Sequence, residues 1–183
     1  MGDWPVVAMP PPFSITPWHA DSLHVMPRGV PSTAPVSGVT VQNQAYFYPF
    51  RIDTGAVANA MGVINGATQN GNIDMGIYDN EFNRIVSQGS TAAAGVTNGL
   101  KVLNITDTTL NPGTYWMAYV TDSATNTVFR TVAADEASIP ANPMMVQASA
   151  FPLPNPAAPT RDAAATPVCV IAMAVSFLGA DAF

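Results

Sequence analysis

The sequence predicts an all-β protein, an antiparallel β-sandwich or jelly roll of about eight or nine strands with an extended proline-rich N-terminal arm. Three observations lead to this fold class. Short apolar runs with two-residue alternation recur at roughly ten-residue intervals from residue 39 onward. Turns dense in Gly, Asn and Pro separate these runs. Only 133–138 has a composition compatible with a helix, and that stretch is short.

The predicted arm comprises residues 1–38. It holds nearly half of the seventeen prolines and follows no sustained period of 2 or 3.6 residues. Because each proline fixes φ and removes a backbone donor, we expect an extended, semi-rigid segment that cannot bury a core by itself. The apolar residues expected to anchor the arm on a neighbouring protein are Trp4, Phe13, Trp18 and Val25.

A sandwich domain is expected over residues 39–178, with a Pro/Ala-rich linker at 152–167 before its final apolar strand. The runs expected to form strands are 39–53, 57–65, 72–78, 84–90, 100–106, 114–122, 125–132, 144–151 and 168–177. Pro49 lies within the first run and indicates an edge position or a bulge, since proline cannot donate to a neighbouring strand.

The middle runs carry the clearest patterns. The strands at 72–78 and 84–90 flank a polar turn at 79–83, which is typical of a hairpin with a longer loop. Alternation in the first of them places three apolar side chains on one face: Ile73, Met75 and Ile77. The run at 114–122 is apolar or aromatic on both faces, which predicts a central strand covered on both sides.

The final run, 168–177, could be a buried strand or helix by pattern, and its Val and Ile content after Pro167 favours a strand. Its expected core or subunit contacts are Ile171, Met173, Val175 and Phe177. Cys169 lies in the same run and is interpreted as a small buried hydrophobe, because no second thiol exists in the chain.

The composition suggests a subunit of an assembly. Only 10% of the residues are charged, against a usual fraction of roughly 25%. The net charge is −6 and the basic residues are scattered, so no basic patch is expected and nucleic acid is not an expected partner. The longest apolar stretch, 167–180, is shorter than the ~18–20 residues of a membrane-spanning helix, so no membrane partner is expected. A homo-oligomer is expected.

No catalytic residue and no cofactor are predicted. Acyl transfer needs a nucleophile beside a base, and the only histidines, His19 and His24, lie in the proline-rich arm. Together with Asp21 they are only a weak metal-site candidate. Catalytic zinc sites take three protein ligands on a rigid frame, and these residues lie in the predicted arm and not in the sandwich. No phosphate-binding glycine loop precedes a helix.

The stretch around residues 72–81 holds the remaining candidate side chains. Asp74, Asp79 and Glu81 are weak calcium candidates, since their spacing does not match a calcium-binding loop. We interpret Asp79 as a turn former and Asp74 as a strand residue that meets a loop donor or water. Tyr78 and Trp116 are candidates for stacking on a glycan, although such aromatics more often form a core or an interface.

Four segments of the chain carry a pattern in fixed order: aromatic-Pro-Phe, Gly-Asn-x-Asp-x-Gly-Ile-Tyr-Asp, Leu-x-Pro-Gly-x-Tyr and Ala-Phe-Pro-Leu-Pro. They fall at 48–50, 71–79, 110–115 and 150–154. In this order and spacing the sequence resembles a family of β-sandwich proteins encoded by tailed bacteriophages and related prophages, over residues 42–177. The members of that family are mostly uncharacterised proteins of the virion.

The resemblance implies a non-enzymatic structural protein located in the virion, with other virion proteins as partners. The resemblance does not distinguish head from tail. Within the particle we expect capsid decoration or a head or tail appendage, with the arm at 1–38 docking on the neighbour. The alternative is a host-surface glycan-binding module of a phage tail or fibre. An enzyme is the third and least supported reading.

Overall fold

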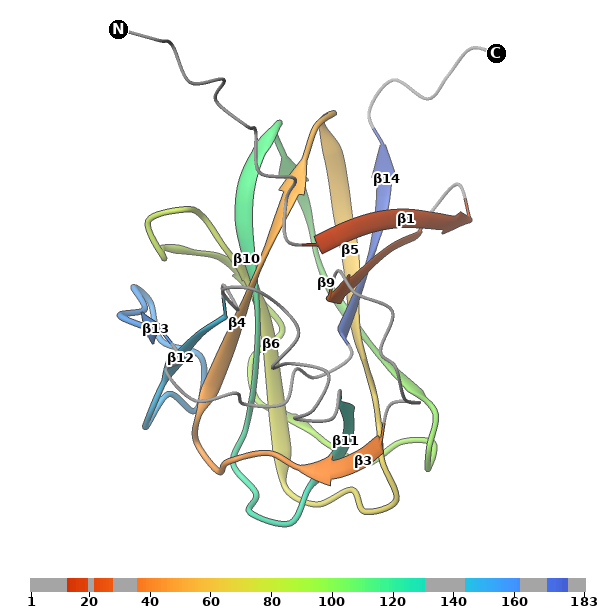
Figure 1. Ribbon diagram of the computed structural model, residues 1–183, viewed down its shortest axis with the longest axis vertical. Coiled ribbons are helices and arrows are strands. Elements are labelled where there is room, and N and C mark those ends of the chain that lie inside the picture. The colour runs from red at the N-terminus through yellow and green to blue at the C-terminus, as the bar shows by residue number, and fades with distance from the viewer. Residues whose placement is uncertain (1–12, 20–21, 28–35, 131–143, 162–170, 178–183) are drawn as a thin grey trace, which may run out of the picture.

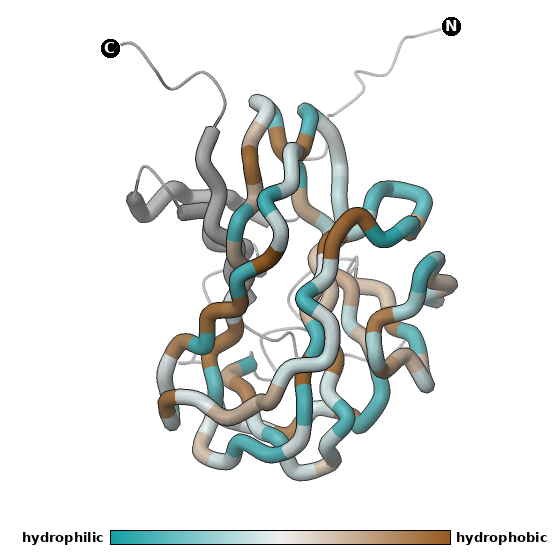
Figure 2. Tube along the Cα trace, turned by 180° about the vertical axis from the view of Figure 1, so that it is seen from behind, coloured by the Kyte–Doolittle hydropathy of each residue, from teal (hydrophilic) through white to brown (hydrophobic). Residues whose placement is uncertain are grey.

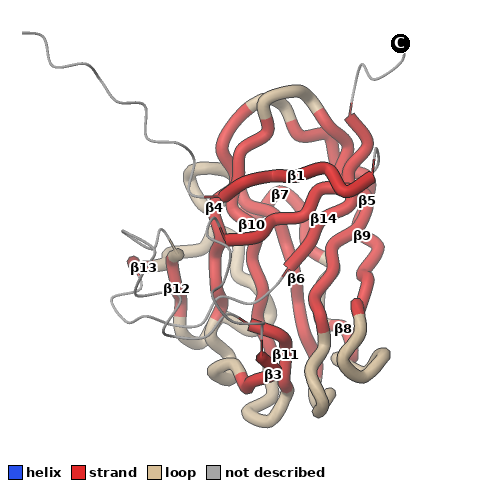
Figure 3. Tube along the Cα trace, turned by 45° about the vertical axis from the view of Figure 1, so that its right-hand side comes forward, coloured by secondary structure: helices blue, strands red, loops and turns tan. Residues whose placement is uncertain are grey.

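The computed structural model describes residues 13–19, 22–27, 36–130, 144–161 and 171–177 (Figure 1). Every helix or strand assigned in these ranges is a β-strand (Figure 3). All strand pairs are antiparallel, and they form a five-stranded sheet, a seven-stranded sheet and a two-stranded ribbon. The predicted fold class, all-β with antiparallel pairing, is confirmed.

The five-stranded sheet has the order β1 (Phe13–His19), β2 (Ser22–Pro27), β14 (Ile171–Phe177), β5 (Ala56–Ile64) and β9 (Leu100–Leu110). The seven-stranded sheet has the order β13 (Thr160–Arg161), β12 (Met145–Gln147), β4 (Ala45–Ile52), β10 (Gly113–Thr121), β6 (Asn72–Tyr78) and β7 (Arg84–Ser87), and β8 (Thr91–Ala92) also pairs with β6. The ribbon consists of β3 (Val36–Val39) and β11 (Thr127–Arg130).

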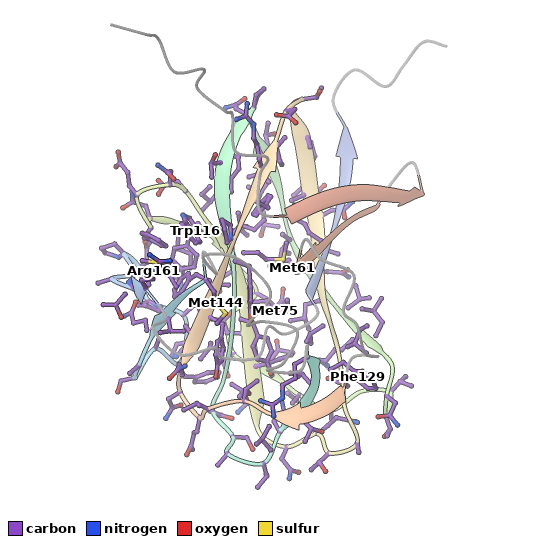
Figure 4. The ribbon with its side chains drawn as sticks, viewed as in Figure 1. Met61, Met75, Trp116, Phe129, Met144 and Arg161 are labelled. Carbon is purple, nitrogen blue, oxygen red and sulfur yellow. The ribbon has the colours of Figure 1, made fainter. Side chains whose placement is uncertain are left out.

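One hydrophobic core joins the two sheets. Both contribute fully buried side chains to it, for example Met61 from β5 and Met75 from β6, which lie near the centre of the molecule (Figure 4). Figure 2 shows hydrophobic and hydrophilic residues interspersed along the trace. Burying one such large side chain contributes about 1.5–3 kcal/mol, so this core is the main source of stability.

The central strands behave as their patterns predict. Ile73, Met75 and Ile77 of β6 all face the core between the sheets and are fully buried. β10 lies between β4 and β6, and its residues contribute to buried clusters on both faces of the sheet. Pro49 of β4 pairs with β10 alone, because β12 covers only residues 45–47 of that strand. The expected edge position of this proline is therefore confirmed.

Two segments differ from expectation. Residues 13–19 and 22–27 are antiparallel strands within the five-stranded sheet, where an extended arm was predicted. The dense prolines concealed these strands, but β1 is an edge strand with an irregularity next to Pro17, a position that tolerates proline. The fourteen strands in the described ranges exceed the predicted eight or nine because β1, β2 and β3 precede the predicted domain or overlap its first residue, and β8 and β13 are very short.

Gly71, which directly precedes β6, occupies a position that only glycine fits. Its φ is +70°, and an added Cβ would meet Asp122 Oδ1 and lie 2.8 Å from the Cβ of Ser123. We expect Gly71→Ala to lower the free energy of unfolding by about 2 kcal/mol, from backbone strain and displacement of Asp122. Gly89 is the matched control, since its φ is +76° but no atom lies within 4 Å of an added Cβ.

Gly89→Ala should lose only about 1 kcal/mol, from strain alone. Urea denaturation measures both variants. Equal losses would show that the contact with Asp122 contributes nothing.

Candidate functional site

The outer face of the seven-stranded sheet carries a second buried cluster. Its sheet residues include Phe47, Tyr78 and Ala118, and a segment from the C-terminal half of the chain covers them. This segment, residues 150–158, is called the strap below. Leu153 of the strap is 2% exposed and packs into the cluster. Part of the linker expected at 152–167 is therefore packed on the sheet, and residues 162–167 lie outside the described ranges.

A buried carboxylate holds the strap to the hairpin. Asp74 of β6 has no exposed surface. Its Oδ2 accepts a hydrogen bond from the backbone N–H of Leu153 at 3.0 Å. Its Oδ1 accepts from Ser87 Oγ at 2.8 Å and from the backbone N–H of Gly89 at 3.0 Å. Asp74 therefore meets loop donors, as its position in the sequence suggested.

Tyr78 and Arg84 add two further attachments. The hydroxyl of Tyr78 donates to the backbone carbonyl of Pro154 at 2.6 Å. The guanidinium of Arg84 donates to the carbonyl of Leu153, and its backbone N–H donates to Asn155 Oδ1. Burial raises the pKa of Tyr78 well above its usual value, while nearby Arg84 lowers it and Asp74 raises it. The hydroxyl therefore stays protonated and remains a donor.

Asp79 organises the turn that follows β6. Its Oδ1 accepts hydrogen bonds from the backbone N–H groups of Glu81 and Asn83, both at 2.9 Å, and its Oδ2 accepts from the side chain of Asn83 at 3.0 Å. The turn places Phe82 at a φ of 62°, and the carbonyl of Phe82 accepts from Ala157 N–H of the strap. The predicted role of Asp79 as a turn former is confirmed.

The turn should weaken in acid. Slight burial acts to raise the pKa of Asp79, but the hydrogen bonds from Asn83 and Glu81 hold it below its ordinary value. The folded-state pKa is thus lower than the unfolded one of about 3.9, so these bonds stabilise the fold above that pH and stop doing so as pH falls through the folded-state pKa. We expect Asp79→Ala to lower the free energy of unfolding by about 1 kcal/mol at neutral pH.

Urea denaturation of the two proteins over a series of pH values from neutral into acid measures this, and the difference should shrink as the carboxylate of Asp79 becomes protonated. A difference that is unchanged in acid would show that the ionised carboxylate is not responsible.

The four patterned segments meet in pairs in the fold. Segment 71–79 bonds to segment 150–154 through Asp74 with Leu153 and Tyr78 with Pro154. Segment 48–50 pairs with segment 110–115 where Phe50 lies opposite Tyr115, and these two rings stack with centroids 5.7 Å apart. The pattern thus marks residues that join distant parts of the chain.

The two glycan-stacking candidates have different surroundings. Tyr78 has no exposed surface, so its ring cannot stack on a sugar, which corrects that prediction. Trp116 is partly buried and packs against Phe82 with ring centroids 4.9 Å apart. Its Nε1 is buried without a hydrogen-bond partner in the described part of the chain. Figure 4 shows Trp116 away from Met61 and Met75, on the side of β12 and β13.

The acidic metal candidates do not gather. Asp74 is buried among three donors, Asp79 is bonded within its turn, and Glu81 is exposed. No group of three His, Cys, Asp or Glu side chains within the described ranges is placed to hold a metal ion. Nor does any helix in these ranges have the length and apolarity to cross a membrane.

The remaining candidates lie toward the chain ends. Phe13, Trp18 and His19 fall in β1, and Val25 and His24 fall in β2. Three residues lie outside the described ranges: Trp4, Asp21 and Cys169. Ile171, Val175 and Phe177 belong to β14 together with Met173, which is buried in the core.

Sequence reasoning missed the strap, and one signal could have revealed it. Phe151 and Leu153 alternate with prolines in "FPLPNP", which is the two-residue period of an extended segment with one apolar face. The density of prolines in the same stretch is also typical of a linker, and it led to the prediction of one at 152–167. Arg84, which bonds the strap twice, carried no pattern of its own.

Comparison with protein-family models, with curated proteins and with solved structures gave no match.

Proposed function

We propose that this chain is a non-enzymatic structural protein of a bacteriophage particle, built as a jelly-roll-type β-sandwich and serving as capsid decoration or as a head or tail appendage. The observation that carries the proposal is the pairing of the four patterned segments. Asp74, Tyr78 and Asp79, the most site-like residues of the pattern, all bond backbone or loop groups of the same chain. These hydrogen bonds stabilise the fold.

The composition supports a role in an assembly. A chain with 10% charged residues depends on neutral polar and apolar surface, which suits contact with neighbours more than life as a free enzyme. Large apolar side chains are also exposed, including Val41 at 55% and Val102 at 56%. We propose that the partners are other virion proteins and further copies of this chain, with residues 1–38 contributing to docking.

A glycan-binding module of a tail or fibre is the weaker alternative, because one of its two candidate aromatics is buried. Quantitative mass spectrometry of gradient-purified particles tests the main proposal. The chain should co-purify with the major capsid protein at a fixed ratio through two successive gradients. Recovery only in the soluble fraction of the lysate would refute it.

A further inference from the structure

The ribbon carries an arginine that lacks a partner. Arg130, the last residue of β11, is partly buried, and its Nε is buried without a hydrogen-bond partner. Within the described ranges the only ion pair joins Arg51 to Asp53, so none of the carboxylates in these ranges pairs with Arg130. A guanidinium has five N–H donors and is charged at all physiological pH values. Leaving it unpaired in a partly buried place is unfavourable.

Gly38 leaves open the space that this guanidinium occupies. Gly38 lies opposite Val128 in the ribbon, and a Cβ added to it would come within 2.6 Å of Arg130 Cζ and Nη2. The guanidinium therefore lies directly against the backbone of β3, in space that only a glycine leaves open.

Other partnerless polar atoms lie at the same ribbon. In the described part of the chain, four buried side-chain polar atoms have no partner, and three belong to Thr40, Asn65 and Arg130. Thr40 directly follows β3 and is 6% exposed, and Asn65 bridges to Val128 of β11. Buried polar groups are nearly always bonded, so this concentration indicates a missing ligand. The partnerless atom of Asn65 is its Oδ1, which is a hydrogen-bond acceptor. It would not bind a negatively charged ligand, so Asn65 is left out of the site proposed below.

We propose that Arg130 and Thr40 form a binding site for a carboxylate carried by a neighbouring protein. A carboxylate has two coplanar oxygens that match the donor fork of a guanidinium, and the partly exposed end of Arg130 can present its terminal N–H groups to it. The hydroxyl of Thr40 is buried, so it would donate to the same carboxylate only after the side chains around it shift. Thr40 is two residues beyond Gly38, so in an extended chain both residues face the same side.

This proposal relies on the proposed particle role only for the identity of the neighbour. The site can be tested on the isolated protein with acetate as the probe. The Nε–H NMR signal of Arg130, assigned by its loss in Arg130→Lys, should shift saturably with sodium acetate and not with sodium chloride at equal ionic strength. The signal of Arg51, already paired with Asp53, should not follow it. Gly38→Ala should displace the guanidinium and weaken acetate binding about tenfold.

Stability gives a second readout. Arg130→Met should leave the Tm unchanged or raise it, because it removes an uncompensated charge. Arg84→Met is the matched control and should lower the Tm, because Arg84 donates to the carbonyl of Leu153. A marked loss of Tm in Arg130→Met would show that the guanidinium already has an internal partner, and would overturn the proposal.

Two further results would also overturn it. One is the absence of a saturable acetate shift at Arg130. The other is a change of the acetate-free Arg130 signal in the double variant Asp135→Asn/Glu136→Gln, which would mean that the chain's own acids fill the site. If acetate binds as expected but the chain is absent from particles, the site stands and only the particle role fails.

Discussion

Replacing Asp74 by alanine should lower the free energy of unfolding by about 3–5 kcal/mol, the largest effect of any single substitution considered for this protein. The carboxylate is fully buried and accepts hydrogen bonds from Ser87, Gly89 and Leu153. Alanine would leave the backbone N–H of Leu153 and the hydroxyl of Ser87 without their acceptor, and each such group costs about 1–3 kcal/mol. The N–H of Gly89 would keep Ser87 Oγ as an acceptor at 2.9 Å. Urea denaturation followed by tryptophan fluorescence measures the loss.

Two variants control this experiment. Asp74→Asn retains one acceptor oxygen of similar shape and should lose only about 1–2 kcal/mol. Asp53→Ala removes an exposed aspartate whose single partner is Arg51, and should lose no more than about 1 kcal/mol. If Asp74→Ala behaved like Asp53→Ala, the buried carboxylate would not be what holds the strap and the hairpin together.

Leu153→Ala should produce the second largest loss, about 2–4 kcal/mol, because it opens a cavity between the strap and the sheet. Leu153 is 2% exposed, and its Cδ1 lies 3.1 Å from where a Cβ on Gly76 would be. The strap therefore packs closely on β6. Thermal or urea unfolding measures the change.

Leu100→Ala is the matched control for Leu153. It removes the same atoms from a side chain that is 51% exposed at the start of β9, and its effect should stay within about 0.5 kcal/mol. Similar effects of the two substitutions would mean that the strap is loosely attached, as a linker would be. Combining Asp74→Ala with Leu153→Ala should cost less than the sum of the single losses, because both changes release the same segment.

The sequence predicted best where strand alternation coincided with burial. The alternation at 72–78 places Ile73, Met75 and Ile77 on the core side, as observed. The aromatic and apolar run at 114–122 predicted a strand covered on both faces, and β10 is central in its sheet. Such patterns are informative because one core constrains every second residue of a strand.

Proline-rich segments were predicted less well, for a physical reason. Proline removes a donor, but it is compatible with edge strands and with segments that bond through other residues. Pro17 lies in the edge strand β1 and Pro154 bonds Tyr78 through its carbonyl, so neither proline prevented ordered contacts. The strap residues that bond Asp74 and Arg84 lie about 70 to 80 residues away in the chain, and no local pattern could reveal such long-range pairs.

The acidic residues of the candidate site serve to stabilise the fold. Asp74 and Asp79, which were weak candidates for a calcium site, organise the strap and a turn. A buried polar group without a hydrogen-bond partner lies instead at Arg130, in the ribbon formed by β3 and β11. In the proposed account, the sandwich is a stable body and its ends make the contacts with neighbours.

Electron microscopy of the particle tests the central claim most directly. A map of purified particles should contain density that fits the two-sheet body, in multiple symmetry-related copies, with the β3–β11 ribbon facing a neighbouring protein. Gold-labelled antibodies against the chain should decorate the same position. A complete particle map in which every density is assigned to other proteins, with no antibody labelling, would contradict the account.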